Sequence, residues 1–180
     1  MWRQTMMRRR VKKPGGSVSR VRDVVTGDHA AILALNNVAV PHVNALSPED
    51  FAWLSSHTSF FRLVEDSDGL LGFALVLPSG LDYWSDNYKW FAARMPRFLY
   101  LDRVVVAERA RQQGVGRALY EALFAFGAGV WPRVTLEVNR RPANPDSERF
   151  HERLGFTAIG VREYNAGENA VLLMERSLGA

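Results

Sequence analysis

The chain has 180 residues, of which 47% are hydrophobic and 23% charged, and it carries a formal net charge of +4. These values are typical of one folded domain and exclude a chain that is disordered throughout, and no apolar run approaches the roughly 20 residues of a membrane-spanning helix. The absence of cysteine excludes disulfides, thiolate metal sites and a cysteine nucleophile, and it favours a cytoplasmic location. The four histidines lack metal-ligand spacing, so we expect no metal.

The positive charge is concentrated at the N-terminus. Residues 1–22 contain eight Lys and Arg and no acidic residue, whereas residues 23–180 contain 15 basic and 19 acidic side chains. We expect residues 1–16 to form a disordered basic tail that precedes one domain over residues 17–180, because like-charge runs are usually solvated. A tail that tethers the protein to nucleic acid is the alternative, but the acidic balance of the remainder argues against a nucleic-acid partner.

Periodicity and turn residues predict an α/β chain of the α+β type. The clearest helix start is Ser47-Pro48-Glu49-Asp50, which combines a capping serine, a proline at the first helical position and acids in the first turn. The predicted order is β α α β β β α β α β β. In chain order, the expected elements are a strand at 17–25, helices at 30–37 and 48–57, strands at 60–65 and 70–77, an irregular aromatic stretch at 78–97, a strand at 98–106, a helix at 115–128, a strand at 133–138, a helix at 146–154, and strands at 156–164 and 170–177.

A glycine-containing turn follows the strand at 98–106 and precedes the helix at 115–128. Its sequence is Arg111-Gln112-Gln113-Gly114-Val115-Gly116-Arg117. A helix N-terminus with close backbone approach and two arginines suits a phosphate. The turn is not a P-loop, because Arg117-Ala118 replaces the Lys-Ser/Thr pair, and it lacks the third glycine of a dinucleotide-binding fingerprint.

The same turn matches the R/Q-x-x-G-x-G/A signature of the GNAT superfamily of N-acetyltransferases. A second block, NPDSERFHERLGF at 144–156, resembles that superfamily's N-x-x-S-x-x-F-Y-x-x-L-G-F motif. The element order is also similar, and the stretches DYWSDNYKWF and FLYLDRVVV resemble a bacterial branch that implies no particular substrate. The resemblance implies the GNAT fold, a mixed and mostly antiparallel sheet of about seven strands with helices on both faces.

The resemblance further implies that acetyl-coenzyme A binds where the strands at 98–106 and 133–138 splay apart. The pyrophosphate would lie on the backbone N–H groups of 112–117. The expected cofactor-binding residues are Val104, Val105, Val106, Arg111, Gln112, Gln113, Gly114, Val115, Gly116, Arg117, Asn144 and His151. The backbone of the three valines would make the cofactor contacts, so their side chains could equally be ordinary packing residues of the strand.

By resemblance, the chemistry is direct attack of a neutral amine on the thioester, which needs a base and a proton for the thiolate. His151 stands where the family usually has tyrosine, so it is either the acid or a residue that packs beside the cofactor. Asp102 and Tyr100 share one strand face and could pass the amine proton to water, although Asp102 could instead form a structural ion pair.

By resemblance, two segments of the chain would bind the amine acceptor. Aromatic faces and acids there could hold a cationic amine of a small molecule or peptide. The candidate residues are Asn37, His42, Asn44, Tyr83, Trp84 and Asp86. The alternative is that the aromatic stretch packs onto the domain or onto the partner in a homodimer. The expected activity is acetyl-CoA-dependent N-acetylation of a primary amine, and the alternative is a non-catalytic module that binds or senses acyl-CoA.

Overall fold

The computed structural model describes residues 10–11, 19–40 and 43–179. They form two compact units, each built from two stretches of the chain. The first unit combines the residues up to Leu75 with Arg103–Leu123, and the second combines Val76–Asp102 with the residues from Phe124 onward.

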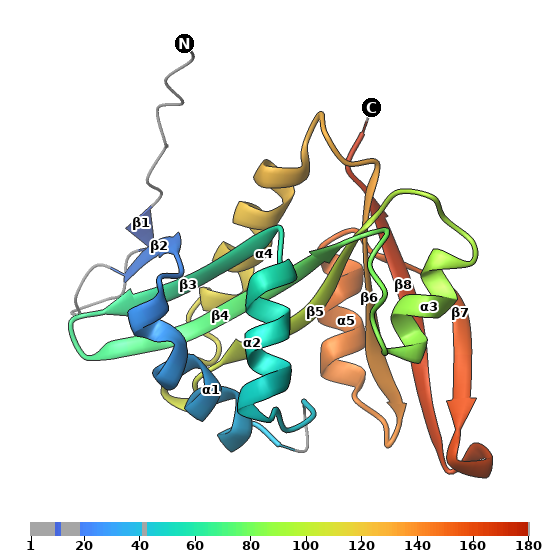
Figure 1. The fold of residues 1–180 in the computed structure, drawn as a ribbon, viewed down its shortest axis with the longest axis horizontal. Coiled ribbons are helices and arrows are strands. Elements are labelled where there is room, and N and C mark those ends of the chain that lie inside the picture. The colour runs from blue at the N-terminus through green and yellow to red at the C-terminus, as the bar shows by residue number, and fades with distance from the viewer. Residues whose placement is uncertain (1–9, 12–18, 41–42, 180) are drawn as a thin grey trace. The chain divides into compact units, whose positions relative to one another are not determined.

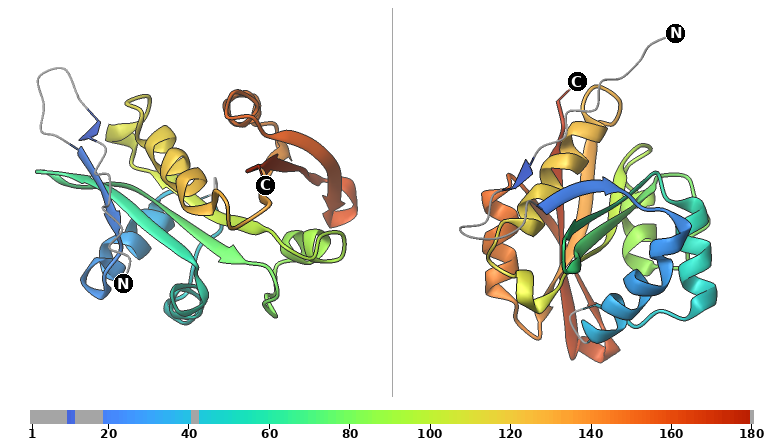
Figure 2. Two further views of the ribbon diagram at one scale, coloured as in Figure 1. Left: turned by 90° about the horizontal axis from the view of Figure 1, so that it is seen from above. Right: turned by 90° about the vertical axis from the view of Figure 1, so that its left-hand side faces the viewer.

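The first unit has the strand order β1-β2-β3-β4-β5. Helices α1 and α2 cover one face of these strands, and the beginning of α4 covers the other (Figure 2). The elements are β1 (Arg10–Val11), β2 (Ser19–Asp23), β3 (Phe60–Asp66), the first part of β4 (Gly69–Pro78), the last part of β5 (Leu99–Val106), α1 (His29–Val38), α2 (Pro48–His57), α4 (Val115–Gly127) and two short 3-10 turns, Thr26–Asp28 and Glu108–Ala110.

The second unit has the strand order β4-β5-β6-β8-β7. Strands β5 and β6 are parallel where Leu99 and Tyr100 pair with Val134 and Thr135, whereas β8 is antiparallel to both of its neighbours. Helices α3 and α5 lie on opposite faces of these strands (Figures 1 and 2). The additional elements are α3 (Asp86–Ala92), β6 (Arg133–Arg141), α5 (Pro145–Arg153), β7 (Thr157–Tyr164), a 3-10 turn (Asn165–Gly167) and β8 (Asn169–Ser177).

The mixed sheet with helices on both faces confirms the predicted fold class. The predicted helix after Ser47 is present because the Ser47 hydroxyl accepts a hydrogen bond from the Asp50 N–H at 3.0 Å. The predicted tail lies outside the described residues except for Arg10 and Val11, which pair with β2. The irregular stretch predicted at 78–97 instead contains α3, which begins where the Ser85 hydroxyl accepts from the Tyr88 N–H at 3.4 Å.

The aromatic stretch around α3 belongs to the core of the second unit. Tyr88, Phe91, Phe98 and Tyr100 are each at most 1% exposed, and their rings lie 5.3 to 6.2 Å apart in tilted or edge-on contacts. The Tyr88 hydroxyl donates to the Pro78 carbonyl at 2.8 Å, which satisfies its buried polar atom. These four side chains therefore pack onto the domain, which was the alternative to a role in binding the acceptor.

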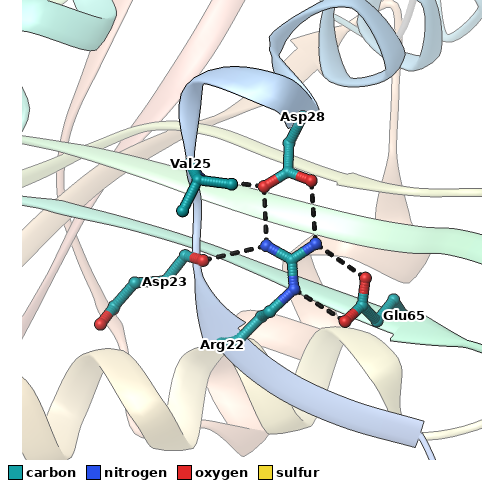
Figure 3. Close-up of polar contacts among 5 residues, drawn as sticks. All are labelled: Arg22, Asp23, Val25, Asp28 and Glu65. Atoms are coloured by element: carbon teal, nitrogen blue, oxygen red, sulfur yellow. Dashed lines mark hydrogen bonds and ion pairs between the residues drawn. The ribbon is translucent and has the colours of Figure 1, made fainter.

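In the first unit, Arg22 joins β2, β3 and the turn before α1 (Figure 3). Its guanidinium donates to both Asp28 oxygens at 2.6 and 2.8 Å and to both Glu65 oxygens at 2.7 and 2.8 Å. The arginine hydrogen bonds lower the pKa of Asp28 to about 2 and lower that of Glu65. Arg22 is thus a structural residue of β2, although the sequence groups it with the basic N-terminus.

We expect Asp28→Asn to lower the free energy of unfolding by about 1–2 kcal/mol at pH 7, because it removes a partly buried ion pair. The folded pKa is depressed, so the wild-type advantage is present above the ordinary value near 4 and is lost as the pH falls towards 2. Urea unfolding at pH 7, 5 and 3 measures this difference. Asp23→Asn is the matched control, because the Arg62–Asp23 pair is more exposed and should contribute less. Equal losses in the two variants would contradict the expectation.

Candidate active site

In the first unit, the glycine-containing turn presents an exposed backbone at the start of α4. Gln112 and Gly114 adopt left-handed conformations, with φ of 59° and 82°, which turn the chain sharply before Val115. The Gln113 side chain donates to the Arg109 carbonyl at 2.7 Å and braces the turn. The first N–H groups of α4 have no carbonyl partner within the helix, and Arg111 and Arg117 are exposed beside them. The turn therefore has the features of an anion-binding site.

The strands before this turn pack unusually closely. A Cβ atom at Gly72 on β4 would lie 2.6 Å from the Val105 carbonyl oxygen and 3.2 Å from the Val115 side chain. Val105 is buried, whereas Val104 and Val106 are only partly buried, as alternation along β5 requires. Glycine at position 72 thus lets β4 approach the end of β5 and the start of α4, which fixes the turn.

Two of the acceptor residues predicted in the first unit, Asn37 and Asn44, form hydrogen bonds that stabilise the loop after α1. The Asn37 amide bonds to both the N–H and the carbonyl of Leu46, at 2.9 and 3.1 Å. The carbonyl of Asn44 accepts from Arg103 at 2.7 Å and from Asn36 at 3.1 Å. Sequence reasoning missed this buried Asn36–Arg103 pair, which is 2.9 Å apart, because polar residues at helix and strand positions predict exposure. His42 lies outside the described residues.

In the second unit, a polar cluster surrounds Tyr100. The Tyr100 hydroxyl donates to the Glu137 carboxylate, 2.9 and 2.8 Å from its two oxygens, and lies 3.5 Å from the Ser85 hydroxyl. The Tyr83 hydroxyl donates to Asp102 at 2.6 Å. Two carboxylates, from β5 and β6, are therefore held by two buried tyrosines at the parallel strand pair.

The electrostatics of the cluster single out Glu137. Burial raises the pKa of Glu137 to about 7, and the charge of Asp102 adds to this effect. Burial together with these two carboxylates holds the pKa of Tyr100 well above its usual value, so its hydroxyl stays protonated and donates. Glu137 can therefore gain or lose a proton near neutrality. Sequence reasoning missed it, although a single acid inside the apolar run Val-Thr-Leu-Glu-Val was a usable signal.

The three acceptor residues predicted in the second unit differ in exposure. Tyr83 is only 4% exposed and bonds to Asp102, so it belongs to the polar cluster. Trp84 is 47% exposed and packs edge-on against Tyr83, with ring centres 4.6 Å apart. Asp86 is at the surface, where its carboxylate lies 3.6 Å from the Arg162 guanidinium. Of these three residues, only Tyr83 lies in the polar cluster. Trp84 and Asp86 follow it closely in the sequence and have exposed side chains.

The second sequence motif spans the whole of α5, from its N-cap at Asn144 to the residues after its end. The Asn144 side-chain oxygen accepts from the Ser147 N–H at 3.3 Å, so Asn144 caps the helix. His151 is 6% exposed, and its Nδ1 lies 2.7 Å from the Ser147 carbonyl. A carbonyl only accepts, so Nδ1 carries the proton and Nε2 is the acceptor. Burial lowers the pKa of His151, which makes the imidazole neutral at pH 7 and disfavours proton donation from an imidazolium.

The chain belongs to the GNAT family of acetyltransferases, because the model of that family matches residues 30–156. Enzymes of this family use acetyl-CoA. No curated protein sequence matches the chain. Within residues 10–11, 19–40 and 43–179, no helix is long and apolar enough to cross a membrane.

Solved structures of N-acetyltransferases share the fold. The ribosomal-protein-S18-alanine N-acetyltransferase from Escherichia coli aligns with a TM-score of 0.70 at 18% identity, over 90% of this chain and 95% of that chain. Naa20 from Chaetomium thermophilum aligns with a TM-score of 0.70 at 22% identity, over 87% of this chain and 85% of that chain. NAA60 from Arabidopsis thaliana, in complex with a bisubstrate analogue, aligns with a TM-score of 0.70 at 16% identity, over 88% of this chain and 97% of that chain. At these identities the likeness establishes the fold.

We expect His151→Phe to retain kcat within about tenfold of the wild type, because a neutral imidazole is a poor proton donor and phenylalanine keeps the packing on Phe150 and Phe156. Loss of an essential acid would instead lower kcat by about 10²–10⁴-fold. Initial rates of thiol release at saturating acetyl-CoA measure this, with the melting temperature as a check on folding. A loss of the larger size in a folded variant would restore the acid role to His151.

Proposed function

We propose that this protein transfers an acetyl group from acetyl-CoA to a primary amine of a small molecule or peptide, with Glu137 as the general base. The observation that carries this proposal is the Glu137 carboxylate, which accepts hydrogen bonds from buried Tyr100 and whose pKa burial raises to about 7. A base with a pKa near the working pH is the most effective at taking a proton in the transition state. A cytoplasmic location is part of the same proposal.

The glycine-containing turn supports binding of the cofactor's phosphates. The N–H groups of 112–117 and the side chains of Arg111 and Arg117 offer positive charge to an anion. Arg117 is 73% exposed in its 3.0 Å pair with Glu121, and such a surface pair is weak enough for a phosphate to compete with it. We retain Val104, Val105, Val106, Asn144 and His151 as proposed contacts of the pantetheine arm. Acetyl-CoA would supply the activated acetyl group.

The polar cluster supplies the proton chemistry. An acceptor ammonium has an ordinary pKa near ~10.4, so it must lose a proton before its nitrogen can attack. Glu137 takes that proton, directly or through water, and the neutral nitrogen then attacks the thioester, so that the new C–N bond forms and the C–S bond breaks. As the amide forms, the nitrogen releases its second proton, and that proton passes, directly or through water, to the leaving thiolate. Tyr100 orients the Glu137 carboxylate, and the negative charge of Asp102 makes Glu137 more basic.

The acceptor is a cationic amine in this account. Glu137 and Asp102 place negative charge where an ammonium would bind, and the exposed ring of Trp84 offers a cation–π surface. A peptide N-terminus and a small-molecule amine share this chemistry. The Escherichia coli protein of the same fold acts on an alanine of ribosomal protein S18, which makes peptide N-termini a first choice of substrate to test.

The decisive experiment is an assay of thiol release from acetyl-CoA with a panel of peptides and small amines. We expect turnover with at least one amine and a product heavier by one acetyl group. Tight binding of acetyl-CoA with no turnover on any amine would favour a module that binds acyl-CoA without catalysis.

We expect Glu137→Gln to lower kcat/KM by about 10²–10⁴-fold, because it removes the base while glutamine still accepts the Tyr100 hydrogen bond. In the wild type, kcat/KM should rise with pH through about 7 as Glu137 ionises, and the variant should lack this limb. A pH–rate profile from pH 5.5 to 9 measures both effects. If the variant showed the same rise of kcat/KM with pH, that rise would have to come from the ionisation of another group.

We expect Arg111→Ala and Arg117→Ala each to raise KM for acetyl-CoA by about three- to tenfold with little change in kcat, because phosphate contacts bind ground state and transition state alike. The effect should shrink at high salt, where exposed charge pairs are screened. Arg20→Ala is the matched control, since it removes an exposed arginine from β2. An equal rise in KM in the control would show a general effect of net charge.

A further inference from the structure

In the first unit, the hairpin of β3 and β4 is bonded to the 3-10 turn that precedes the glycine-containing turn. The Arg109 guanidinium donates to both oxygens of the Asp66 carboxylate, at 3.3 Å each. Its Nη2 also donates to the carbonyl oxygens of Gly69 and Leu70, at 3.3 Å each. One arginine side chain therefore holds the 3-10 turn against the end of β3 and the start of β4.

Asp66 is a fixed partner for this arginine. Its side chain is only 3% exposed, whereas the Arg109 side chain is 41% exposed. The Asp66 carboxylate also accepts from the Asp68 N–H at 3.0 Å, within the hairpin turn that Gly69 completes with a φ of 107°. A buried carboxylate held by its own turn stays in one place, and charge-assisted bonds to it restrain the arginine.

The backbone of Arg109 connects this ion pair to the glycine-containing turn. The Arg109 carbonyl accepts the hydrogen bond from the Gln113 side chain at 2.7 Å. Gln113 stands between Gln112 and Gly114, whose left-handed conformations turn the chain. The hydrogen bonds therefore run from Asp66 to Arg109 and from Arg109 to Gln113, all inside the first unit.

We propose that Asp66 and Arg109 are positioning residues that hold the glycine-containing turn in the conformation that binds the phosphates of coenzyme A. Asp66 acts through Arg109, and Arg109 acts through its carbonyl and Gln113. This inference rests on the proposed role of the turn as the site of the cofactor's phosphates. If the turn spends less time in its binding conformation, the dissociation constant rises in proportion.

The charge of Asp66 makes the direction of the effect informative. Asp66→Asn removes a negative charge and leaves the charge of Arg109 less offset. If charge alone mattered, the variant would bind an anion more tightly than the wild type does. If Asp66 positions the turn, the variant binds more weakly, because a neutral amide restrains a guanidinium less than a carboxylate does. The two explanations predict opposite changes for the same substitution.

The binding test is isothermal titration calorimetry of coenzyme A with the full chain, together with initial rates of thiol release. We expect Asp66→Asn to raise the dissociation constant about three- to fivefold. KM for acetyl-CoA should rise by the same factor while kcat stays unchanged, because phosphate contacts bind ground state and transition state alike. Damage to the fold would instead lower the fraction of active protein and hence the apparent kcat.

A double variant tests the route through Gln113, and a matched variant controls for charge. In the Gln113→Ala background, Asp66→Asn should raise the dissociation constant little further, as expected when one residue acts through the other. Asp23→Asn removes the same charge from the more exposed Arg62–Asp23 pair and should leave the affinity for coenzyme A unchanged. Additive losses in the double variant would overturn the route through Gln113.

Amide hydrogen exchange without coenzyme A follows the turn itself. The Arg111 N–H donates to the Glu108 carbonyl at 3.2 Å, so its protection reports whether the chain before Gly114 is ordered. We expect Asp66→Asn to speed exchange at Arg111 by about threefold or more, while the amides of β2 exchange as in the wild type.

The outcomes separate this inference from the proposed function. Unchanged exchange at Arg111 in Asp66→Asn would overturn the inference, and so would tighter binding of coenzyme A. Faster exchange together with an unchanged affinity would support the positioning role of Asp66 and reject the turn as the site of the cofactor's phosphates.

Discussion

The hydrogen bond from the Tyr100 hydroxyl to Glu137 is the interaction on which the proposed chemistry depends. Burial of a carboxylate costs free energy, and the pKa of Glu137 rises to about 7 because the protein compensates only part of that cost. Tyr100 stays neutral in the same surroundings, so it stabilises the carboxylate without competing for negative charge. If the protein stabilised the carboxylate more strongly, Glu137 would have the pKa of an ordinary acid and would be a poor base at neutral pH. If it stabilised the carboxylate less, Glu137 would stay protonated.

The aromatic core of the second unit produces these surroundings. Tyr88 and Phe91 contact the ring of Tyr100, and Phe98 packs against both of them, while the Tyr100 hydroxyl bonds to Glu137 on β6. The stretch that includes α3 therefore supplies the packing around Tyr100. In the first unit, close packing at Gly72 and the turn at Gln112 fix the backbone N–H groups that we propose as the anion-binding site.

Local signals predicted much of the fold, including the glycine-containing turn before α4. The Ser47-Pro48 start and the glycines after β5 act through local contacts and local backbone conformation, so sequence alone reveals them. Helix α3 escaped prediction because tertiary packing of its aromatic residues outweighs their modest helix propensity. Glu137 escaped because its pKa depends on Tyr100 and Asp102, which pairing of distant strands brings near. The motif predicted the place of His151 but not its protonation, which burial decides.

The most direct test of the central claim compares the free energy of unfolding of the wild type and Glu137→Gln between pH 4 and pH 8.5. The folded pKa of Glu137 is raised, so its stabilising contribution is complete below about 4.5 and is lost as the pH rises through about 7. We predict that the wild type loses up to about 3 kcal/mol relative to the variant over this window. Parallel stability curves would show that Glu137 titrates normally, and they would contradict the account.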